Sequence, residues 1–547
     1  MRNTQTVGQG GAAMYSGKEL WKDYISYELK PFRISETRVI ETYENLPENL
    51  YRMLQETAKK MPDKTAVTDD CGHACTYREL LEKTDRFSSW LHYHSKIRHG
   101  QHAALMLYNS LEFCVAFLAL NKLGVVVIPM QTKYRRPEIE ALLDKAYASL
   151  ILTDPDFEEW FSSNKEAGLE IISCSDIHNG YGWSAYEDSR DCEIEGTVLD
   201  DALLVFTSGT TSRSKGVMIR NFNISHAIVS YQKTLKITEQ DVTVIPVPLY
   251  LITGLIALFG LFVYVGGSAF IHQFFNADQV LSCVQKENVT FIHASPTVFS
   301  LLLETAPKYP SLPSLVKFAC GSSNMPKEKI RQLHRWLPQS SFHTVYGLTE
   351  TTSPGTIFPT DASVSPYIGS SGIPIPGMNI KILRDDGTEA EPGETGGIHL
   401  NGANLLDSYY RMETPLLQKN WLDTGDLGYV NEEGYLFIVD RKKDMINRGG
   451  EKICSFDVEN EIYRIDGVLD AAVVAIPDAK YGEVSAALIR TTPEFDKTEE
   501  EMKALLKSRL ASYQVPARIC KVSEIPVTPN NKIDKKYIRT HFEEYTS

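Results

Sequence analysis

No charged side chain occurs between Val242 and Ile271, and this stretch restricts the possible folds more than any other part of the chain. It is long enough for a helix that crosses a bilayer. Six residues that break regular structure interrupt it, namely Pro246, Pro248, Gly254, Gly260, Gly266 and Gly267. We therefore expect a strand over Val242–Pro248, a helix over Thr253–Tyr264 and a turn at Gly266–Gly267. A buried core segment or a ligand tunnel is the preferred interpretation, and a membrane span is the alternative.

The length and the order of predicted elements indicate several units. The chain has 547 residues, which exceeds the size at which one hydrophobic core usually stops growing. Strand and helix patterns alternate before residue 200 and again over Asn223–Phe318, which predicts parallel sheets covered by helices. Short strands separated by turns over Ile368–Ile438 predict a smaller β-rich unit. The last hundred residues form a mixed pattern, and we place the main boundary at Asp440–Lys443.

The fold class expected is therefore α/β. A large N-terminal domain, residues 1–440, would combine parallel-sheet αβ subdomains with a small β-rich subdomain. Residues 441–547 would form a small α+β C-terminal domain.

Composition excludes several classes of function. Lys and Arg number 56 against 70 Asp and Glu, a net charge of −14, which opposes binding to a phosphate backbone and so argues against a nucleic-acid partner. The nine cysteines form no CxxC pair, and Cys71, His73 and Cys75 lack a partner cluster, so we expect no zinc site. The cysteine usage is typical of the reducing cytoplasm. The first twenty residues contain no apolar run, so we expect a disordered tail and no secretory signal.

The strongest local motif is an apolar strand, Leu203–Phe206, that runs into a loop rich in hydroxyl groups and ends at Lys215-Gly216. Small residues allow backbone N–H groups to approach a phosphate, and hydroxyl groups add further donors. The loop is not the Walker type, because no glycine directly precedes Lys215. A Ser/Thr-rich surface turn is the plain alternative.

Further motifs follow this loop in the chain: Tyr346–Glu350 (YGLTE), Trp421–Asp426 (WLDTGD), Asp440–Asp444 (DRKKD), Arg448–Ile453 (RGGEKI) and Pro526–Asp534 (PVTPNNKID). In this order they resemble the adenylate-forming superfamily, which includes acyl-CoA synthetases, adenylation domains of peptide synthetases and beetle luciferases. The resemblance covers roughly residues 45–545 and is nearest to the acyl-CoA ligases. The chain departs from the usual pattern at Ser212, Ser214, Asp440 and Asn531, and none of these departures removes a charged catalytic group.

The resemblance implies an acid–thiol ligase that uses ATP to activate a carboxylic acid as acyl-AMP, releases pyrophosphate and transfers the acyl group to CoA. The residues that would hold the ATP phosphates are Thr207, Ser208, Gly209, Thr210, Thr211 and Lys215. Thr349 would contact the α-phosphate, Glu350 would hold Mg²⁺, and Lys532 would bridge the carboxylate and the α-phosphate. The remaining cofactor-binding residues would be Ser322, Ser323, Asn324, Tyr346, Gly347, Asp426, Arg441, Gly449 and Gly450. Lys443 would be the hinge about which the C-terminal domain turns.

The same resemblance places the acid beside Tyr250, Leu251, Thr253 and Gly254. No acidic residue lies between Thr243 and Asn276, so an aliphatic or aromatic acid, as in fatty acid metabolism, is favoured over an amino acid. CoA is the expected acceptor. A stand-alone ligase that loads the phosphopantetheine arm of an acyl carrier protein is the alternative. A binding protein without catalysis is less compatible with Lys532, Glu350 and Asp426.

Overall fold

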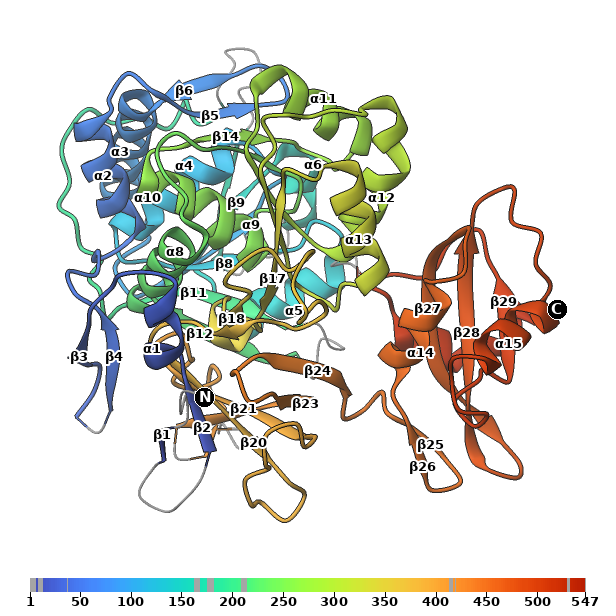
Figure 1. The fold of residues 1–547 in the computed structure, drawn as a ribbon. Helices are drawn as coiled ribbons and strands as arrows, with labels where there is room; N and C mark the ends of the chain where they lie inside the picture. Colours follow the sequence, from blue (N-terminus) through green and yellow to red (C-terminus); the bar gives the residue numbers. More distant parts are fainter. Residues whose placement is uncertain are drawn as a thin grey trace.

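The computed structural model describes residues 6–7, 13–36, 38–161, 168–174, 182–207, 214–412, 417–418, 420–528 and 532–546. A large body is followed by a smaller C-terminal body, residues 443–546, which lies to one side of it (Figure 1). The chain passes from one to the other directly after strand β24 (Leu436–Arg441). The predicted α/β fold class is confirmed.

Two largely parallel sheets form the centre of the large body. The first has nine strands, in the order β19 (Ile373–Pro374), β18 (Thr356–Ile357), β17 (Ser341–Tyr346), β16 (Lys317–Cys320), β15 (Phe291–Ala294), β13 (Val242–Ile245), β14 (Ser268–Ile271), β5 (Thr65–Asp69) and β6 (Ala74–Thr76). The second has six, in the order β10 (Glu170–Ser173), β9 (Leu150–Thr153), β7 (His102–Met106), β8 (Val126–Pro129), β11 (Asp201–Phe206) and β12 (Gly216–Arg220). Neighbouring parallel strands need a long crossover connection, which is usually a helix.

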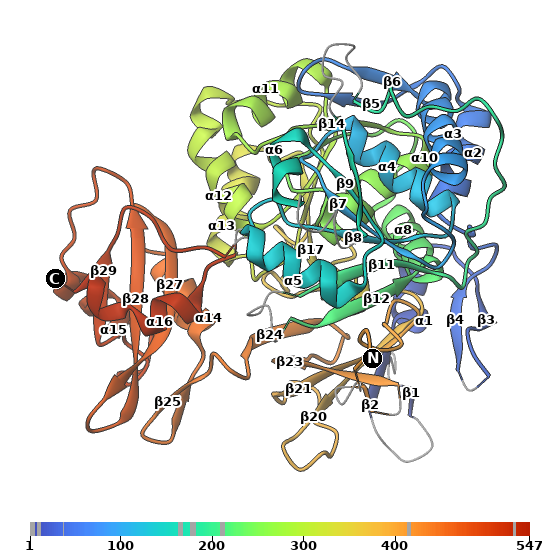
Figure 2. The same cartoon turned by 180° about the vertical axis from the view of Figure 1, so that it is seen from behind.

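The helices of the large body pack on these sheets (Figures 1 and 2). They are α2 (Leu50–Lys60), α3 (Tyr77–His94), α4 (Leu111–Lys122), α5 (Arg136–Ala146), α6 (Pro155–Glu158), α8 (Asn221–Leu235), α11 (Ala277–Glu287), α12 (Pro296–Thr305) and α13 (Lys327–Trp336). Side chains fix their starts: Asn49 accepts from the Arg52 N–H, and Thr76 and Glu79 form a reciprocal capping box at α3.

The uncharged stretch is a buried part of this body. Strand β13 leads into a continuous helical run of α9 (Ile252–Gly254), the π-helix η4 (Leu255–Gly260) and α10 (Leu261–Val265). Gly266, at φ +80°, ends the run before β14. All six residues of η4 are buried. The predicted helix and turn are confirmed, and the predicted strand is present but ends earlier, at Ile245. None of the described helices combines the length and hydropathy that a bilayer span requires.

The β-rich unit is a third, antiparallel sheet in the order β1 (Thr6–Val7), β2 (Ala13–Ser16), β20 (Met378–Leu383), β21 (Gly396–Gly402), β23 (Trp421–Val430) and β22 (Leu417–Gln418), with β24 beside β23. The prediction of a disordered N-terminal tail is wrong for Ala13–Leu20. Tyr15 pairs with Ile380 across β2 and β20 and is buried, and α1 (Gly17–Leu20) follows. Trp21, also buried, donates to the Pro374 carbonyl at 2.8 Å. These partners, in β20 and at Pro374, lie hundreds of residues further along the chain, so the local sequence does not reveal that the segment is ordered. Strands β3 (Leu29–Arg33) and β4 (Val39–Tyr43) form a separate hairpin.

The C-terminal body has its own five-stranded sheet, formed by β26 (Glu451–Ile453), β25 (Ile446–Arg448), β28 (Gly482–Thr491), β27 (Val468–Asp478) and β29 (Arg518–Lys521). Helices α14 (Ser455–Ile462), α15 (Glu499–Lys507) and α16 (Lys535–Thr540) accompany it. Apolar side chains of β27 and β28 alternate between two buried clusters, so both faces of the sheet are covered. A body with its own core can turn as a unit.

Candidate active site

Four parallel strands of the nine-stranded sheet end at one edge. Thr243 of β13 pairs with Phe291 of β15, His293 pairs with Ala319 of β16, and Cys320 pairs with Thr344 of β17. The segments that follow β13, β16 and β17 contain the predicted acid residues, Ser322–Asn324, and Gly347, Thr349 and Glu350. The space beyond the carboxyl ends of parallel strands is the usual ligand site of such sheets. The structure therefore brings the segments of the predicted site to one edge.

The base of the predicted phosphate loop is a hairpin. Phe206 of β11 pairs with Gly216 of β12, and the Thr207 N–H donates to the Lys215 carbonyl at 2.9 Å. The Lys215 ammonium lies 4.8 Å from the ring centre of Tyr409, over its face. The predicted phosphate-binding residues Ser208, Gly209, Thr210 and Thr211 lie outside the described residues. The hairpin fixes Thr207 and Lys215 at opposite ends of the loop.

Glu350 lies in the short helix η6 (Thr349–Thr351), which follows β17 and Gly347. Its Oε1 accepts a hydrogen bond of 2.9 Å from the Tyr409 hydroxyl, and its backbone carbonyl accepts from the Leu406 N–H. Tyr409 itself pairs with Val217 in β12. A carboxylate beside a phosphate loop suits Mg²⁺, which prefers oxygen ligands. Sequence reasoning missed Tyr409, because its link to both motifs exists only in three dimensions.

Asp426, Arg441 and Tyr346, three of the predicted cofactor-binding residues, lie together. Asp426 of β23 pairs with Arg441 of β24, and the Arg441 Nε lies 3.4 Å from its Oδ1. The Tyr346 hydroxyl donates to Asp426 Oδ2 at 2.8 Å. Burial raises the pKa of Asp426, while Arg441, the Tyr346 hydroxyl and Lys532 oppose that rise. The carboxylate is therefore fixed from both sides.

Lys532 reaches this cluster from the C-terminal body. Its carbonyl accepts from the Thr528 N–H at 2.7 Å, and Val527 and Ile533 form a bridge, so Lys532 lies in a closed loop. Burial and the neighbouring Arg441 lower the pKa of Lys532 to about 8, while Asp426 and Glu350 act in the opposite direction. The catalytic lysine expected from the sequence thus lies among the acidic residues expected to bind nucleotide and metal.

Ser322, Ser323 and Asn324 follow β16 at the same edge. Ser322 has φ +73°, a left-handed conformation that turns the chain sharply after Gly321. Ser322 and Ser323 are exposed, and Asn324 is half-buried. Their polar side chains are therefore accessible to a ligand.

The predicted acid segment follows β13. Asn109, which is buried, donates to the Val247 carbonyl at 3.0 Å and accepts from the Leu249 N–H at 2.7 Å, which holds the segment in place. Tyr250 is buried, and burial raises its pKa to about 12. A Cβ at Gly254 would lie 2.3 Å from the Pro248 carbonyl oxygen, so only glycine fits there. Leu251 and Thr253 are half-buried. The π-helix that follows is a backbone feature often found at functional sites.

Gly449 and Gly450 form the turn between β25 and β26, both at positive φ. The Gly449 N–H donates to the Tyr481 carbonyl at 2.8 Å, and the Arg448 guanidinium stacks on the Tyr481 ring. These contacts lie within the C-terminal body, and the hairpin extends away from the large body (Figure 1). In this arrangement the glycine turn is separate from the nucleotide cluster.

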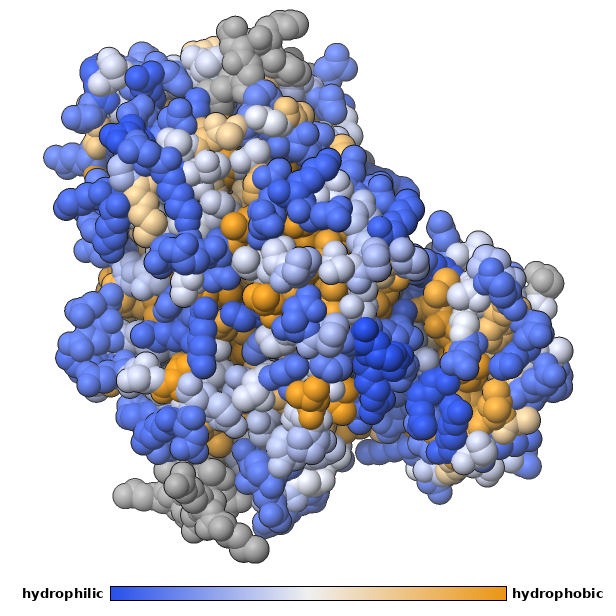
Figure 3. Space-filling model, turned by 45° about the horizontal axis from the view of Figure 1, so that its top comes forward, coloured by the Kyte–Doolittle hydropathy of each residue, from blue (hydrophilic) through white to orange (hydrophobic). Residues whose placement is uncertain are grey.

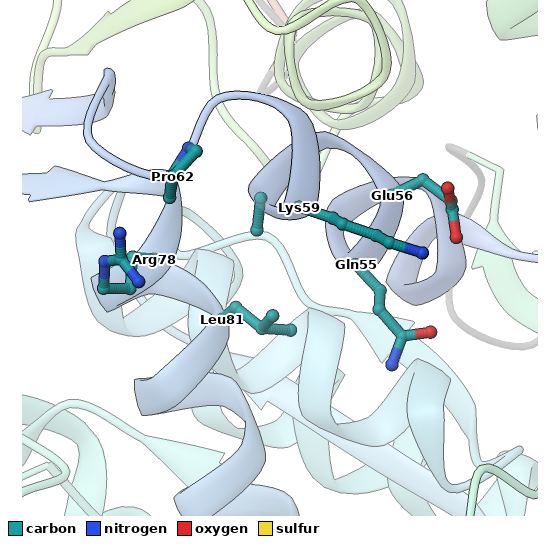
Figure 4. Close-up of a pocket in the computed structure, with 7 residues that line it drawn as sticks. Gln55, Glu56, Lys59, Pro62, Arg78 and Leu81 are labelled. Carbon is teal, nitrogen blue, oxygen red and sulfur yellow. The ribbon is translucent and has the colours of Figure 1, made fainter.

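Two other surface features do not bring residues of the predicted site together. A hollow of about 440 Å³ between α2 and α3 is lined by Gln55, Glu56, Ala58, Lys59, Pro62, Arg78 and Leu81, none of which belongs to a predicted motif (Figure 4). In the Cys71–Cys75 turn His73 pairs with Asp69, Cys71 is exposed and Cys75 is buried. By contrast, the surface is indented where the two bodies meet, and apolar side chains gather near the middle of the same face (Figure 3).

Comparison with known proteins identifies the family. Residues 54–410 match the profile of AMP-binding enzymes, and residues 457–532 match that of the AMP-binding enzyme C-terminal domain. A feruloyl-CoA synthase of an Amycolatopsis species is 30% identical, with 89% of this chain and 97% of that protein aligned. A 2-succinylbenzoate–CoA ligase of Bacillus subtilis is 32% identical over the same shares.

Solved structures agree with this. The o-succinylbenzoate CoA synthetase of Bacillus subtilis in complex with its acyl-adenylate intermediate has a TM-score of 0.78 and 30% identity, covering 89% of this chain and 97% of that one. The same enzyme has been solved with ATP and a magnesium ion. The predicted superfamily and enzyme class are confirmed: the chain belongs to the family of AMP-binding enzymes and is an AMP-forming acid–thiol ligase.

Proposed function

We propose that this protein converts a carboxylic acid, ATP and CoA into an acyl-CoA thioester, AMP and pyrophosphate through an enzyme-bound acyl-adenylate. One observation carries the proposal. Lys532 of the C-terminal body lies within electrostatic reach of Glu350 and Asp426 of the large body, at the carboxyl edge of a parallel sheet. Two cations, Lys532 and Arg441, lie near two carboxylates from different motifs, an arrangement suited to a multiply charged substrate.

In the first half-reaction an oxygen of the substrate carboxylate attacks the α-phosphorus of ATP, and the bond to pyrophosphate breaks. Lys532 neutralises the charge that grows on the oxygens around phosphorus. Lys215 and Thr207 hold the outer phosphates, and Asp426 with Arg441 orients the ribose. Glu350 is the residue that would hold Mg²⁺, which supplies further charge neutralisation when bound.

In the second half-reaction the CoA thiol attacks the acyl carbon, and AMP leaves. We place the turn at Gly449 and Gly450 on the face that the C-terminal body presents at this stage. The free-thiol acceptor and ATP favour a cytoplasmic location.

The segment Tyr250–Leu255 carries no charge, which favours an acid with an apolar body. The relatives named for feruloyl and 2-succinylbenzoate substrates favour an acid with an aromatic ring. An acyl carrier protein is the alternative acceptor, and the acceptor test below distinguishes it from CoA.

The test is pyrophosphate release over a panel of aromatic and aliphatic acids, with and without CoA. We expect pyrophosphate release with aromatic acids, and formation of acyl-CoA only when CoA is present.

Lys532→Ala should abolish adenylation but leave thioester formation from supplied acyl-adenylate largely intact, because that step needs no charge at the α-phosphate. Wild-type pyrophosphate release by this variant would contradict the proposal. Acyl transfer to a holo carrier protein but not to CoA would show that the carrier protein is the acceptor instead of CoA.

A further inference from the structure

One buried side chain near the site has an unused hydrogen-bonding atom. His293 in β15 is 1% exposed, and its Nδ1 has no hydrogen-bond partner in the described part of the chain. Burial lowers the pKa of His293 to about 3, so the ring is neutral and offers one donor and one acceptor. Buried polar atoms in folded proteins are nearly always paired, so an unpaired one indicates a missing partner.

The position of His293 connects it to the acid site. It is the penultimate residue of β15, at the carboxyl edge. A Cβ built on Gly321 would lie 3.5 Å from His293 Nε2, so backbone without a side chain adjoins the ring. Gly321 directly precedes Ser322, and β13, which leads to the acid segment, is the strand next to β15.

A second set of contacts connects His293 to the turn that follows η6. The Tyr231 ring of α8 lies 5.6 Å from the His293 ring, and the Tyr231 hydroxyl is 2.9 Å from Ser353 Oγ. Ser353 follows η6, which contains Glu350. His293 therefore lies on the strand next to β13, which leads to the acid segment, and Tyr231 connects it to the turn that follows η6.

The chemistry around His293 limits what can bind it. The nearest rings are those of Tyr231 and Phe291, at 5.6 and 6.3 Å, which suit the edge or face of an aromatic ring. A neutral imidazole cannot balance a second carboxylate, and a buried unpaired charge is unfavourable. A neutral hydroxyl or carbonyl oxygen matches the free nitrogen.

We propose that His293 binds a hydroxyl or carbonyl group carried by an aromatic acid, remote from the carboxylate that is activated. His293 is then a specificity-determining residue of the ligase. This inference rests on the proposed function and adds the substituent that the enzyme selects.

The test compares matched acids that differ by one hydroxyl group: benzoate with 3- and 4-hydroxybenzoate, and cinnamate with 4-hydroxycinnamate. In the wild-type enzyme we expect kcat/KM for pyrophosphate release to be at least about tenfold higher for one hydroxylated acid than for its parent, the usual effect of one satisfied buried hydrogen bond. In His293→Phe this ratio should fall to near one, while KM for ATP stays unchanged.

His343→Phe is the matched control, because His343 is a buried histidine on the next strand but one whose Nδ1 is bonded to the Phe358 carbonyl at 2.8 Å. It should leave the hydroxyl preference in place. If His293→Phe fails to fold, His293→Gln keeps a donor and an acceptor and should retain part of the preference, whereas His293→Leu should not.

Two results would overturn this inference about His293 without affecting the proposed function. One is an unchanged preference for hydroxylated acids in His293→Phe, and the other is a wild-type enzyme that prefers the unsubstituted acids. Pyrophosphate release with none of the acids, aromatic or aliphatic, would instead refute the proposed function.

Discussion

At the scale of single residues, the site depends on how neighbours set the charge of Lys532. Burial and Arg441 favour the neutral amine, whereas Asp426 and Glu350 favour the ammonium, and the balance leaves a pKa of about 8. An ammonium is needed to neutralise charge during adenylation. The free enzyme therefore holds this catalytic charge near neutral pH but loses it in mild alkali.

We predict a descending alkaline limb in the adenylation half-reaction. Below a pH of about 8 Lys532 is protonated, so kcat/KM for ATP should be constant there and fall towards tenfold per pH unit above it. Pyrophosphate exchange measured from pH 6 to 10 checks this. Lys532→Arg, slower but permanently charged, should lack the limb. If kcat/KM for Lys532→Arg falls at the same pH, a group other than Lys532 causes the fall.

Tyr409 acts through Glu350. Its hydroxyl bonds to Glu350 Oε1, and its ring lies under the Lys215 ammonium. It thereby links the carboxylate expected to hold Mg²⁺ with the phosphate loop. Removal of the hydroxyl frees the carboxylate but keeps the ring, which separates the two contacts.

We predict that Tyr409→Phe raises KM for Mg²⁺-ATP by about tenfold, with a smaller change in kcat. This factor equals about 1.4 kcal/mol, close to the lower end of what one hydrogen bond to a charged group contributes. Initial rates at several Mg²⁺ concentrations measure this. Tyr410→Phe is the control, since the Tyr410 hydroxyl is 3.5 Å from the Ala146 carbonyl and does not contact Glu350. Equal effects in both variants would refute a specific role.

At the scale of elements, the connection after β24 is divided between the two bodies. The Lys442 N–H donates to the Gly425 carbonyl at 3.0 Å, and the Lys442 ammonium pairs with Asp423, both in the large body. The Lys443 carbonyl instead accepts from Arg539 of α16 at 3.4 Å, and Arg539 also pairs with Asp444. Lys442 is thus bonded to the large body and Lys443 to the C-terminal body. We therefore propose that Lys443 is the hinge and that the domain boundary lies beside it.

We predict that Lys443→Pro separates the half-reactions. Proline fixes φ near −65° and removes an N–H, and in the described part of the chain the Lys443 N–H donates no hydrogen bond. Adenylation should survive within about tenfold, whereas transfer to CoA should fall more than about a hundredfold, because the C-terminal body cannot turn. Pyrophosphate exchange and single-turnover transfer give the two rates, with Lys442→Ala as control. An equal fall in both half-reactions would reject this hinge position.

At the scale of the whole molecule, polar contacts hold the C-terminal body in the present orientation. Arg490 of β28 forms a bidentate pair with Glu304 of α12, with one contact at 2.5 Å. Asp440, fully buried at the end of β24, accepts from the Ser455 N–H of α14 at 2.6 Å. Since Lys532 lies in the nucleotide cluster, we assign this orientation to adenylation.

We predict that Glu304→Gln weakens this orientation. A partly buried bidentate pair is worth about 1 kcal/mol, so the population of the present orientation should fall relative to others by about fivefold. Adenylation should slow by up to that factor, while transfer from supplied acyl-adenylate should hold or accelerate. Asp278→Asn, which breaks the exposed Lys308–Asp278 pair of the same body, should change neither rate. Slower transfer in Glu304→Gln would show that the pair serves both orientations.

The sequence by itself determined the local elements and the chemistry of the site. Polar capping residues such as Thr76 fix helix ends within a few residues, and hydrophobic periodicity reports which faces are buried, so α3 and β7 could be predicted closely. Charged groups in ordered motifs, Glu350, Asp426, Arg441 and Lys532, identified the ligase before any fold was known.

Only the tertiary structure decided which distant groups meet. The pairing of β2 with β20, the contact of Tyr409 with Glu350, the unpaired nitrogen of His293 and the pair of Arg490 with Glu304 each join segments far apart in the chain. Such contacts leave no local signal, because each residue type is compatible with many environments. Burial, which sets the pKa of Lys532 and isolates His293, is likewise a property of the packed molecule, since desolvation depends on all the neighbours at once.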